Sequence, residues 1–398
     1  ARCLGSPCVS DCMERSFIIV SGIGPNSGGT GLMMRGLMAE AEGTSVRFVY
    51  RDKSRPRGWA RLNPAWFLRQ RWNRLFFGAN ARRAARSSGE LLLLHPQSIR
   101  PAVLEAMVNS RARTWVYVLD SHFFCERSYN VLRDETSPCL RCLSGSDAPG
   151  AKEGCFSSGK AWPLRARFAE WVRSGKVRLL AQCASQARLL RRYYGEHIAV
   201  PVVPLMVPDL APPPVIVRPV RHRPFVVFHG SPSAAKGIFV VRELARQLPD
   251  CDFLVPTARR KLDRQGGPVE GWPANVSFRR LFWDDGLAEA VAAADLVICP
   301  SVWSAPVEGA VLKSLSHNGL VGLIPDSTAF AGDIPSSARL DLDPADWEAT
   351  SDRIRAMLAD PARQASIRAE AARYIQDYRA ANDGMLYRLY AAISSEGA

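Results

Sequence analysis

The sequence predicts an α/β protein of two doubly wound, Rossmann-like domains that face a cleft. Three observations carry this prediction. Short apolar runs alternate with amphipathic runs along both halves of the chain, each half opens with a strand followed by a glycine-containing loop, and eight of the 28 prolines lie between Pro201 and Pro224. Alternating strands and helices are typical of βαβ units with parallel sheets. A proline-rich stretch forms a stiff, extended linker between domains.

The apolar runs place the strands. In the first half they are expected at Phe17–Ser21, Val46–Tyr50, Leu91–His95, Trp115–Leu119, Val177–Ala181 and Ile198–Val203, and in the second half at Phe225–His229, Cys251–Val255, Val276–Phe278, Leu296–Cys299, Leu320–Ile324 and Ala338–Leu342. Helices are expected at Gly31–Ala41, Gly237–Leu248, Leu287–Ala293 and Glu308–His317, the last starting near Pro306, and over most of Ala345–Ser395.

These elements divide the chain into regions. We expect a tail at 1–15, an N-terminal domain at 16–207 with a cysteine-bearing insertion at 123–158, a linker at 208–223 and a C-terminal domain at 224–374. Helices at 375–398 are predicted to pack back on the N-terminal domain.

Composition limits the class of protein. The 398 residues are 47% apolar and 23% charged, which is typical of a soluble globular protein and excludes disorder and collagen. A net charge of +14 indicates an anionic partner: an acidic membrane, a phosphate-bearing ligand or nucleic acid. No nucleic-acid motif accompanies the charge, so we expect no nucleic-acid partner. Without an apolar run of ~18 residues or a signal-peptide pattern, we expect a cytoplasmic protein, peripheral on the inner face of the plasma membrane.

A glycine loop follows the first strand. It runs from Gly22 to Gly31, and the segment closest to the helix, Gly28-Gly29-Thr30-Gly31, would let backbone N–H groups approach a phosphate or a sugar. Ser27 stands where the dinucleotide fingerprint needs its third glycine. The alternative is a flexible loop without a ligand.

A second glycine loop opens the second half. Gly230 and Ser231 follow the strand, and Lys236-Gly237 precede the helix. A lysine at a helix N-terminus suits a diphosphate and is electrostatically unfavourable there without an anion. The surrounding residues do not make a P-loop, and the alternative is a plain surface lysine.

A buried strand, a turn and a helix follow later. This segment runs Ala294-Asp295-Leu296-Val297-Ile298-Cys299-Pro300-Ser301 and continues through Ser304, Glu308 and Gly309 to Lys313. Together with the two glycine loops and Asn275-Val276-Ser277-Phe278, it resembles the family 4 retaining glycosyltransferases of the GT-B fold, over about Phe17 to Tyr390.

The resemblance implies an activity. It implies that the chain moves a sugar, with retention, from a UDP- or GDP-linked sugar to a hydroxyl of a glycan or lipid-linked acceptor. The C-terminal domain would hold the nucleotide and the N-terminal domain the acceptor. No metal or other cofactor is implied for catalysis, since Lys236 and helix N-termini would stabilise the leaving diphosphate.

Three motifs depart from the family's pattern. Ser231 stands in place of an arginine, Ala305 and Lys313 in place of two glutamates, and Leu119-Asp120 in place of His-Asp. Either this is a divergent enzyme, or it is a catalytically inactive scaffold or glycan-binding protein. For an enzyme, the candidate catalytic residues are Lys236, Glu308, His122 and Asp120. The candidate substrate-binding residues are Gly28, Gly29, Thr30, Gly31, His95, Gly230, Ser231, Gly237, Ser304, Gly309 and Lys313.

Three of these residues have a structural alternative. Glu308 fits a helix start without any ligand, and His95 and His122 are of a type that more often packs than reacts.

Four cysteines gather in the predicted insertion. Cys125, Cys139, Cys142 and Cys155 lie in a segment poor in apolar residues, which a tetrahedral zinc bound by four thiolates would hold together. Free or redox-active thiols are the alternative.

Positive charge concentrates between Arg51 and Arg86. Eleven of these residues are basic and one, Asp52, is acidic; the basic ones are Arg51, Lys53, Arg55, Arg57, Arg61, Arg69, Arg71, Arg74, Arg82, Arg83 and Arg86. Aromatic residues are interleaved with them, and a helix starting at Pro64 would bring Trp66, Phe67 and Phe77 near an interface. The pattern predicts docking on an anionic membrane. The alternative is that the aromatics pack inside.

Overall fold

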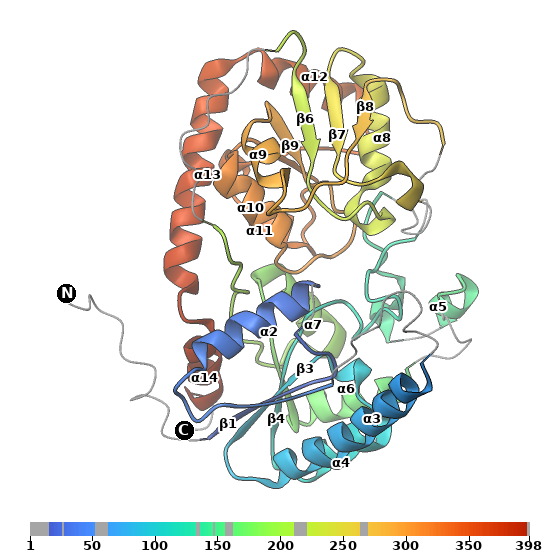
Figure 1. Cartoon of the computed structure of the whole chain (residues 1–398), viewed down its shortest axis with the longest axis vertical. Helices are drawn as coiled ribbons and strands as arrows, with labels where there is room; N and C mark the ends of the chain where they lie inside the picture. The colour runs from blue at the N-terminus through green and yellow to red at the C-terminus, as the bar shows by residue number, and fades with distance from the viewer. Residues whose placement is uncertain are drawn as a thin grey trace, which may run out of the picture. The chain divides into compact units, whose positions relative to one another are not determined.

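The computed structural model describes residues 16–25, 28–51, 63–132, 136–145, 148–155, 162–210, 221–262 and 270–395. The chain forms two compact units: an N-terminal unit of 1–126, 143–206 and 382–398, and a C-terminal unit of 127–142 and 207–381. Each unit holds one parallel sheet flanked by helices, as Figure 1 shows. The predicted pair of doubly wound α/β domains is therefore confirmed.

The N-terminal sheet has five strands in the order β2-β1-β3-β4-β5. They are β1 (Phe17–Ser21), β2 (Arg47–Tyr50), β3 (Glu90–Leu94), β4 (Thr114–Tyr117) and β5 (Val177–Leu180). Every residue of β1 and β4 is buried, which explains why these central strands are continuous apolar runs. The helices are α2 (Gly29–Glu40), α3 (Pro64–Arg86), α4 (Pro101–Asn109), α5 (Ala148–Lys152), α6 (Arg165–Arg173), α7 (Ala184–Tyr194) and α14 (Met385–Ser395), with short turns η2 (Pro96–Ser98) and η3 (Arg141–Ser144).

The C-terminal helix α14 belongs to the N-terminal unit. Leu386 and Leu389 are fully buried in the same core as Phe17 of β1. The Tyr390 ring lies edge-on to Phe17, with centroids 5.9 Å apart, and the Leu386 amide donates to Glu40 Oε2 at 2.7 Å. The last helix therefore completes a core that begins with the first strand.

The C-terminal sheet has six parallel strands in the order β11-β10-β9-β6-β7-β8. They are β6 (Phe225–Phe228), β7 (Asp252–Val255), β8 (Val276–Phe278), β9 (Leu296–Ile298), β10 (Val321–Leu323) and β11 (Leu340–Asp341). The helices are α8 (Ile238–Gln247), α9 (Leu287–Ala292), α10 (Gly309–His317), α11 (Phe330–Asp333), α12 (Trp347–Leu358) and α13 (Pro361–Asn382), with turns η4 (Ala234–Lys236), η5 (Arg259–Lys261) and η7 (Ser336–Ala338). β6 pairs with both β7 and β9, so the loops after β6 and β9 leave the same edge of the sheet side by side.

Two expected elements differ from the structure. The strand predicted at Ile198–Val203 is wrong, since only Val202 forms a bridge, to Ala181. Pro201 and Pro204 on either side lack the N–H groups that a longer ladder would need. The helix expected near Pro306 begins at Gly309, because the Ala305 carbonyl accepts from the Phe330 amide at 2.8 Å and so holds the preceding residues in a loop.

The insertion expected at 123–158 is shared between the units. Residues 127–142 group with the C-terminal unit. Within that unit, Val131 joins the hydrophobic core, and the Tyr129 ring lies 4.5 Å from that of Trp303. Packing of these apolar side chains on the C-terminal core accounts for the assignment.

Leu386→Ala should destabilise the N-terminal unit. The side chain is fully buried, so its truncation leaves a cavity that costs about 2–5 kcal/mol. Urea denaturation measures the loss. Leu32→Ala on α2 is the matched control, because Leu32 is 42% exposed and should cost less than ~1 kcal/mol. Equal losses in the two variants would contradict the role given to α14.

Candidate functional site

The loops after β6 and β9 bring together most of the residues that the sequence singled out in the C-terminal unit. Ligands in open α/β sheets bind outside the carboxyl ends of strands. Lys236 closes η4 directly after the β6 loop, and Gly237 caps the start of α8. Glu308 precedes the first residue of α10 at the end of the β9 loop. The two loops therefore place one basic and one acidic side chain at the same edge.

Lys236 and Glu308 form an ion pair. Lys236 Nζ donates to Glu308 Oε1, and Ser301 Oγ donates to the same oxygen at 2.9 Å. The ammonium also lies 5.0 Å from the centre of the Trp303 ring. The Glu308 side chain is 8% exposed and the Lys236 side chain 20%. The anion that a lysine at this helix start requires is thus supplied by the protein's own carboxylate.

Gly237 allows the two loops to touch. Its φ is +71°, and a Cβ built there would lie 1.8 Å from the Pro300 carbonyl oxygen. Only glycine fits both this backbone conformation and this approach. Gly230 is less constrained, with its nearest contact 3.1 Å away on the Phe228 ring.

His229, which the sequence reasoning missed, lies beneath this edge. Its Nδ1 and Ser314 Oγ are hydrogen-bonded at 2.8 Å, and its ring stacks on Trp283 with centroids 5.1 Å apart. Burial, together with the positive charges of Lys313 and His317, lowers the pKa of His229 to about 3. The imidazole is therefore neutral at physiological pH. Its place between β6 and Gly230 was the available signal.

Lys313, at a position where the resemblance implies an acid, has its charge balanced by another residue. Its Nζ lies 3.0 Å from Asp209 Oδ2 and 4.5 Å from the centre of the Trp283 ring. Gly309 opens the same helix, and a Cβ there would meet Val207 at 3.5 Å.

Ser304 has a structural bonding pattern. Its amide donates to Asn130 Oδ1 at 3.0 Å, while Asn130 Nδ2 donates to Ser304 Oγ at 2.9 Å. Ser304 Oγ is also 2.6 Å from Thr328 Oγ1. Ser231 is exposed on the β6 loop, and its carbonyl accepts from the Ser233 amide. Of these two predicted residues, Ser231 is the one open to a ligand.

In the N-terminal unit, Asp120 gathers the other predicted residues. Gln97 Nε2 donates to Asp120 Oδ2 at 3.0 Å, and the His122 amide donates to Oδ1 at 2.9 Å. His95 Nε2 lies 3.8 Å from Oδ2. These four residues line one small pocket together with Trp162. Gln97 had no sequence signal beyond its place two residues after His95.

The His122 side chain is packed against a neighbouring aromatic ring. Its ring lies 5.3 Å from that of Trp162, and burial, the largest cause, lowers its pKa to about 4. It is therefore neutral at physiological pH. This matches the packed alternative given for it above and leaves Asp120 as the charged group of the pocket.

The first glycine loop ends at α2. Gly28 caps the helix, and Gly29, Thr30 and Gly31 form its first turn, with no acidic residue there. Gly29 and Thr30 are at least partly exposed. A Cβ on Gly22 would lie 2.6 Å from Ser98 Cβ, so the start of this loop touches the η2 loop that carries His95. Asn26 and Ser27 lie outside the described residues.

The four cysteines of the insertion are each partly buried. Cys139 and Cys142 fall in the C-terminal unit, and Cys125 and Cys155 in the N-terminal unit. Across the described ranges, no three His, Cys, Asp or Glu side chains are grouped as metal ligands. The zinc site stays a prediction. Cys3, Cys8 and Cys12 lie outside the described residues.

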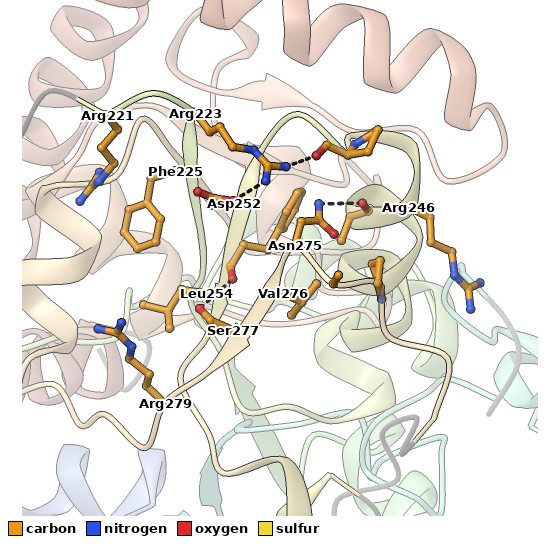
Figure 2. A pocket seen from close by; sticks show the side chains of 15 residues that line it. Arg221, Arg223, Phe225, Arg246, Asp252, Leu254, Asn275, Val276, Ser277 and Arg279 are labelled. Carbon is orange, nitrogen blue, oxygen red and sulfur yellow. Dashed lines mark hydrogen bonds and ion pairs between the residues drawn. The ribbon is translucent and has the colours of Figure 1, made fainter.

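A larger pocket lies along β6, β7 and β8, away from the residues named above (Figure 2). It encloses about 660 Å³ and is lined by Arg221, Arg223, Arg246 and Arg279 among others. Arg223 Nη1 is 3.2 Å from Asp252 Oδ1, and Arg246 Nη2 donates to the Gly271 carbonyl at 2.8 Å. The guanidinium groups of Arg223 and Arg246 are therefore already bound to neighbouring protein groups. For this reason we take the β6–β9 edge, and not this pocket, as the candidate site.

Two units, each with a Rossmann-like parallel sheet flanked by helices, define the GT-B class, and the fold of this chain matches GT-B glycosyltransferase structures of the family 4 type. A sucrose-phosphate synthase from Thermosynechococcus elongatus is similar over 95% of this chain and 100% of its own, with a TM-score of 0.64 at 16% identity. HepE of Anabaena in complex with UDP is similar over 95% of this chain and 100% of its own, with a TM-score of 0.62 at 12% identity.

A third structure has the same fold. An α,α-trehalose-phosphate synthase (UDP-forming) from Burkholderia vietnamiensis covers 97% of this chain and 100% of its own, with a TM-score of 0.59 at 13% identity. No protein-family model matches the sequence, and no curated protein does. The resemblance drawn from the motifs is therefore confirmed at the level of the fold.

Acidification should lower the free energy of unfolding through the buried His229. Its folded-state pKa of about 3 lies below the ~6.5 of an unfolded histidine, so the unfolded chain binds a proton that the folded chain excludes. Above pH ~6.5, His229 does not lower the free energy of unfolding. As the pH drops below this value, proton binding by the unfolded chain lowers the free energy of unfolding, by about 2 kcal/mol at pH ~5. Urea denaturation at both pH values measures it.

The comparison variant is His229→Gln, which cannot titrate. Other groups titrate equally in both proteins, so the difference between their pH dependences isolates His229. Parallel stability profiles would show that the imidazole is not excluded from protonation in the folded protein.

Proposed function

We propose that the chain is a glycosyltransferase that moves a sugar from a nucleotide diphosphate sugar to an acceptor hydroxyl. The observation that carries the proposal is Lys236 at the start of α8, beside the start of α10, on the carboxyl edge of β6 and β9. Helix N-termini and an ammonium group favour the negative charge that develops on a departing diphosphate.

Glu308 gives this site a defined resting arrangement. In the described structure its carboxylate neutralises Lys236 and accepts from Ser301. A bound diphosphate would compete for the same ammonium, so we propose that Lys236 exchanges Glu308 for the donor's phosphates. Glu308 then acts as a positioning residue that keeps the lysine side chain ordered between turnovers.

We propose UDP as the nucleotide, with GDP as the alternative. Its support is that HepE was solved with UDP and with UDP-glucose and that the trehalose-phosphate synthase is named UDP-forming.

The acceptor is proposed to be a glycan or lipid-linked hydroxyl bound by the N-terminal unit, and the reaction to proceed with retention. Asp120, with His95 and Gln97 beside it, offers hydrogen bonds to sugar hydroxyls. The side chains of His95 and Asp120 are already held in place by contacts within the pocket. We therefore assign these two residues to acceptor binding. In a retaining transfer the leaving phosphate itself can take the acceptor's proton, so no further base is needed.

A catalytically inactive nucleotide- or glycan-binding protein is the second candidate. The pairing of Lys236 with Glu308 and of Lys313 with Asp209 favours it, because both cations near the site already have anions. Turnover separates the two candidates: an enzyme releases free nucleotide from a panel of UDP- and GDP-sugars with an acceptor, and an inactive protein binds but releases none.

Nucleotide binding is tested by thermal denaturation with UDP, GDP or ADP. A ligand at about a hundred times its dissociation constant stabilises the folded protein by about 2.7 kcal/mol. We expect UDP to raise the melting temperature more than GDP, and ADP to have the least effect. No shift with any of the three would contradict the proposal.

Lys236→Ala should weaken UDP binding by about 1.5–3 kcal/mol, roughly ten- to 150-fold, as for the loss of a charge-assisted hydrogen bond. Titration calorimetry measures it. Because this variant also leaves Glu308 uncompensated, Lys236→Ala/Glu308→Gln is measured beside it to restore neutrality. Arg379→Ala, exposed on α13, is the control and should bind as wild type. Unchanged affinity in both Lys236 variants would remove Lys236 from the diphosphate site.

A further inference from the structure

The N-terminal half of α3 exposes large apolar side chains. Phe67, Leu68, Trp72, Leu75 and Phe76 are between 49% and 58% exposed. Leu68, Trp72 and Phe76 recur every four residues and Leu75 follows Trp72 by three, which places these four along one side of the helix, with Phe67 beside them. Trp72 and Phe76 stack on each other with ring centroids 5.7 Å apart. We call the five exposed apolar side chains the α3 patch. The alternative that the aromatics pack inside is therefore wrong for this half of α3.

The rest of the helix anchors the patch to the unit. Phe77 is 8% exposed and Ala81 and Ala84 are fully buried, which corrects the expectation that Phe77 lies at an interface. Figure 1 shows α3 running beside α4 on the outside of the N-terminal unit. The patch is thus presented by a helix whose other end is fixed in the core.

Arginines lie along the same helix as this patch. α3 contains six arginines and no acidic residue. Arg71, Arg74, Arg82, Arg83 and Arg86 are exposed, and no carboxylate of the described chain is in ion-pair distance of these five. Burial and the charges of Arg74 and Arg100 lower the pKa of Arg51, which reflects the density of positive charge here. Lys53, Arg55, Arg57, Trp59 and Arg61 lie outside the described residues.

A groove lies next to the patch. It runs between α3 and the edge strand β2, encloses about 690 Å³ and includes Phe76 of the patch. Arg47 and Arg83 contribute guanidinium groups, and Asn73 and Asn80 contribute amides. Guanidinium and amide donors beside an aromatic side chain suit a phosphate that is attached to an apolar chain.

We propose that α3 and this groove dock the N-terminal unit on a bilayer that contains anionic phospholipid. The aromatic side chains enter the interface at headgroup depth, and the arginines bind lipid phosphates, as in interfacial helices with one apolar and one basic side. In the described part of the chain, no helix has the length and apolarity to cross a membrane.

A bilayer fits these observations better than a nucleic acid. Five exposed apolar side chains, two of them aliphatic, gain little from a phosphate backbone but gain from the acyl boundary. A bilayer also matches the excess of arginine without acid, because anionic lipids form a continuous negative surface.

Co-sedimentation with vesicles tests the proposal. The full chain is mixed with vesicles of phosphatidylcholine alone or of phosphatidylcholine with phosphatidylglycerol. We expect binding only to the anionic vesicles, and weaker binding as salt is raised. Arg71→Glu/Arg74→Glu should lower the partition coefficient by at least about thirtyfold. Trp72→Ser/Phe76→Ser should lower it on the same vesicles without changing the net charge.

Matched controls separate the site from total charge and total apolarity. Arg363→Glu/Arg379→Glu on α13 makes the same change in net charge at exposed positions and should bind as wild type. Phe282→Ser removes an aromatic side chain that is 53% exposed in the C-terminal unit and should also bind as wild type. Circular dichroism confirms that each variant is folded.

Several results would overturn the proposal. They are equal sedimentation with neutral and anionic vesicles, no sedimentation with either, and equal losses in the α3 and α13 charge variants. Displacement of the protein from vesicles by RNA, with RNA binding reduced by Arg71→Glu/Arg74→Glu, would assign the surface to nucleic acid instead. None of these readouts depends on sugar transfer, so failure here leaves the proposed function standing.

Discussion

The ion pair between Lys236 and Glu308 is the interaction on which the candidate site depends. It joins the loop after β6 to the loop after β9, and the two loops can meet only because Gly237 lets the Pro300 carbonyl approach. A largely buried charge without its partner costs several kcal/mol. Each residue therefore fixes the position of the other, and the pair holds the two loops together.

Two other titratable groups near this pair carry no unbalanced charge. Lys313 lies beside Asp209, and burial keeps His229 uncharged. The N-terminal unit does the opposite along α3, where arginines stand without acidic neighbours on the helix. Positive charge is thus balanced where a small ligand would bind and left open where an extended anionic surface would fit.

The structure shows which acidic side chain lies beside the lysine before α8. Ala305 and Lys313 are not acidic, and the carboxylate that reaches Lys236 comes from Glu308. Because α10 begins at Gly309 rather than near Pro306, Glu308 lies at the end of a loop whose path brings its side chain to Lys236.

By itself, the sequence determined the positions of most strands and of both glycine loops, because local apolar patterning and glycine placement reflect short-range constraints. It also marked Lys236, Asp120 and the basic aromatic helix α3. Only the tertiary structure decided which side chains meet. Glu308 with Lys236, His229 with Trp283 and Asn130 with Ser304 join residues 72, 54 and 174 positions apart. Such contacts depend on how strands are ordered in the sheet and on where loops turn, and the local apolar pattern of the sequence determines neither.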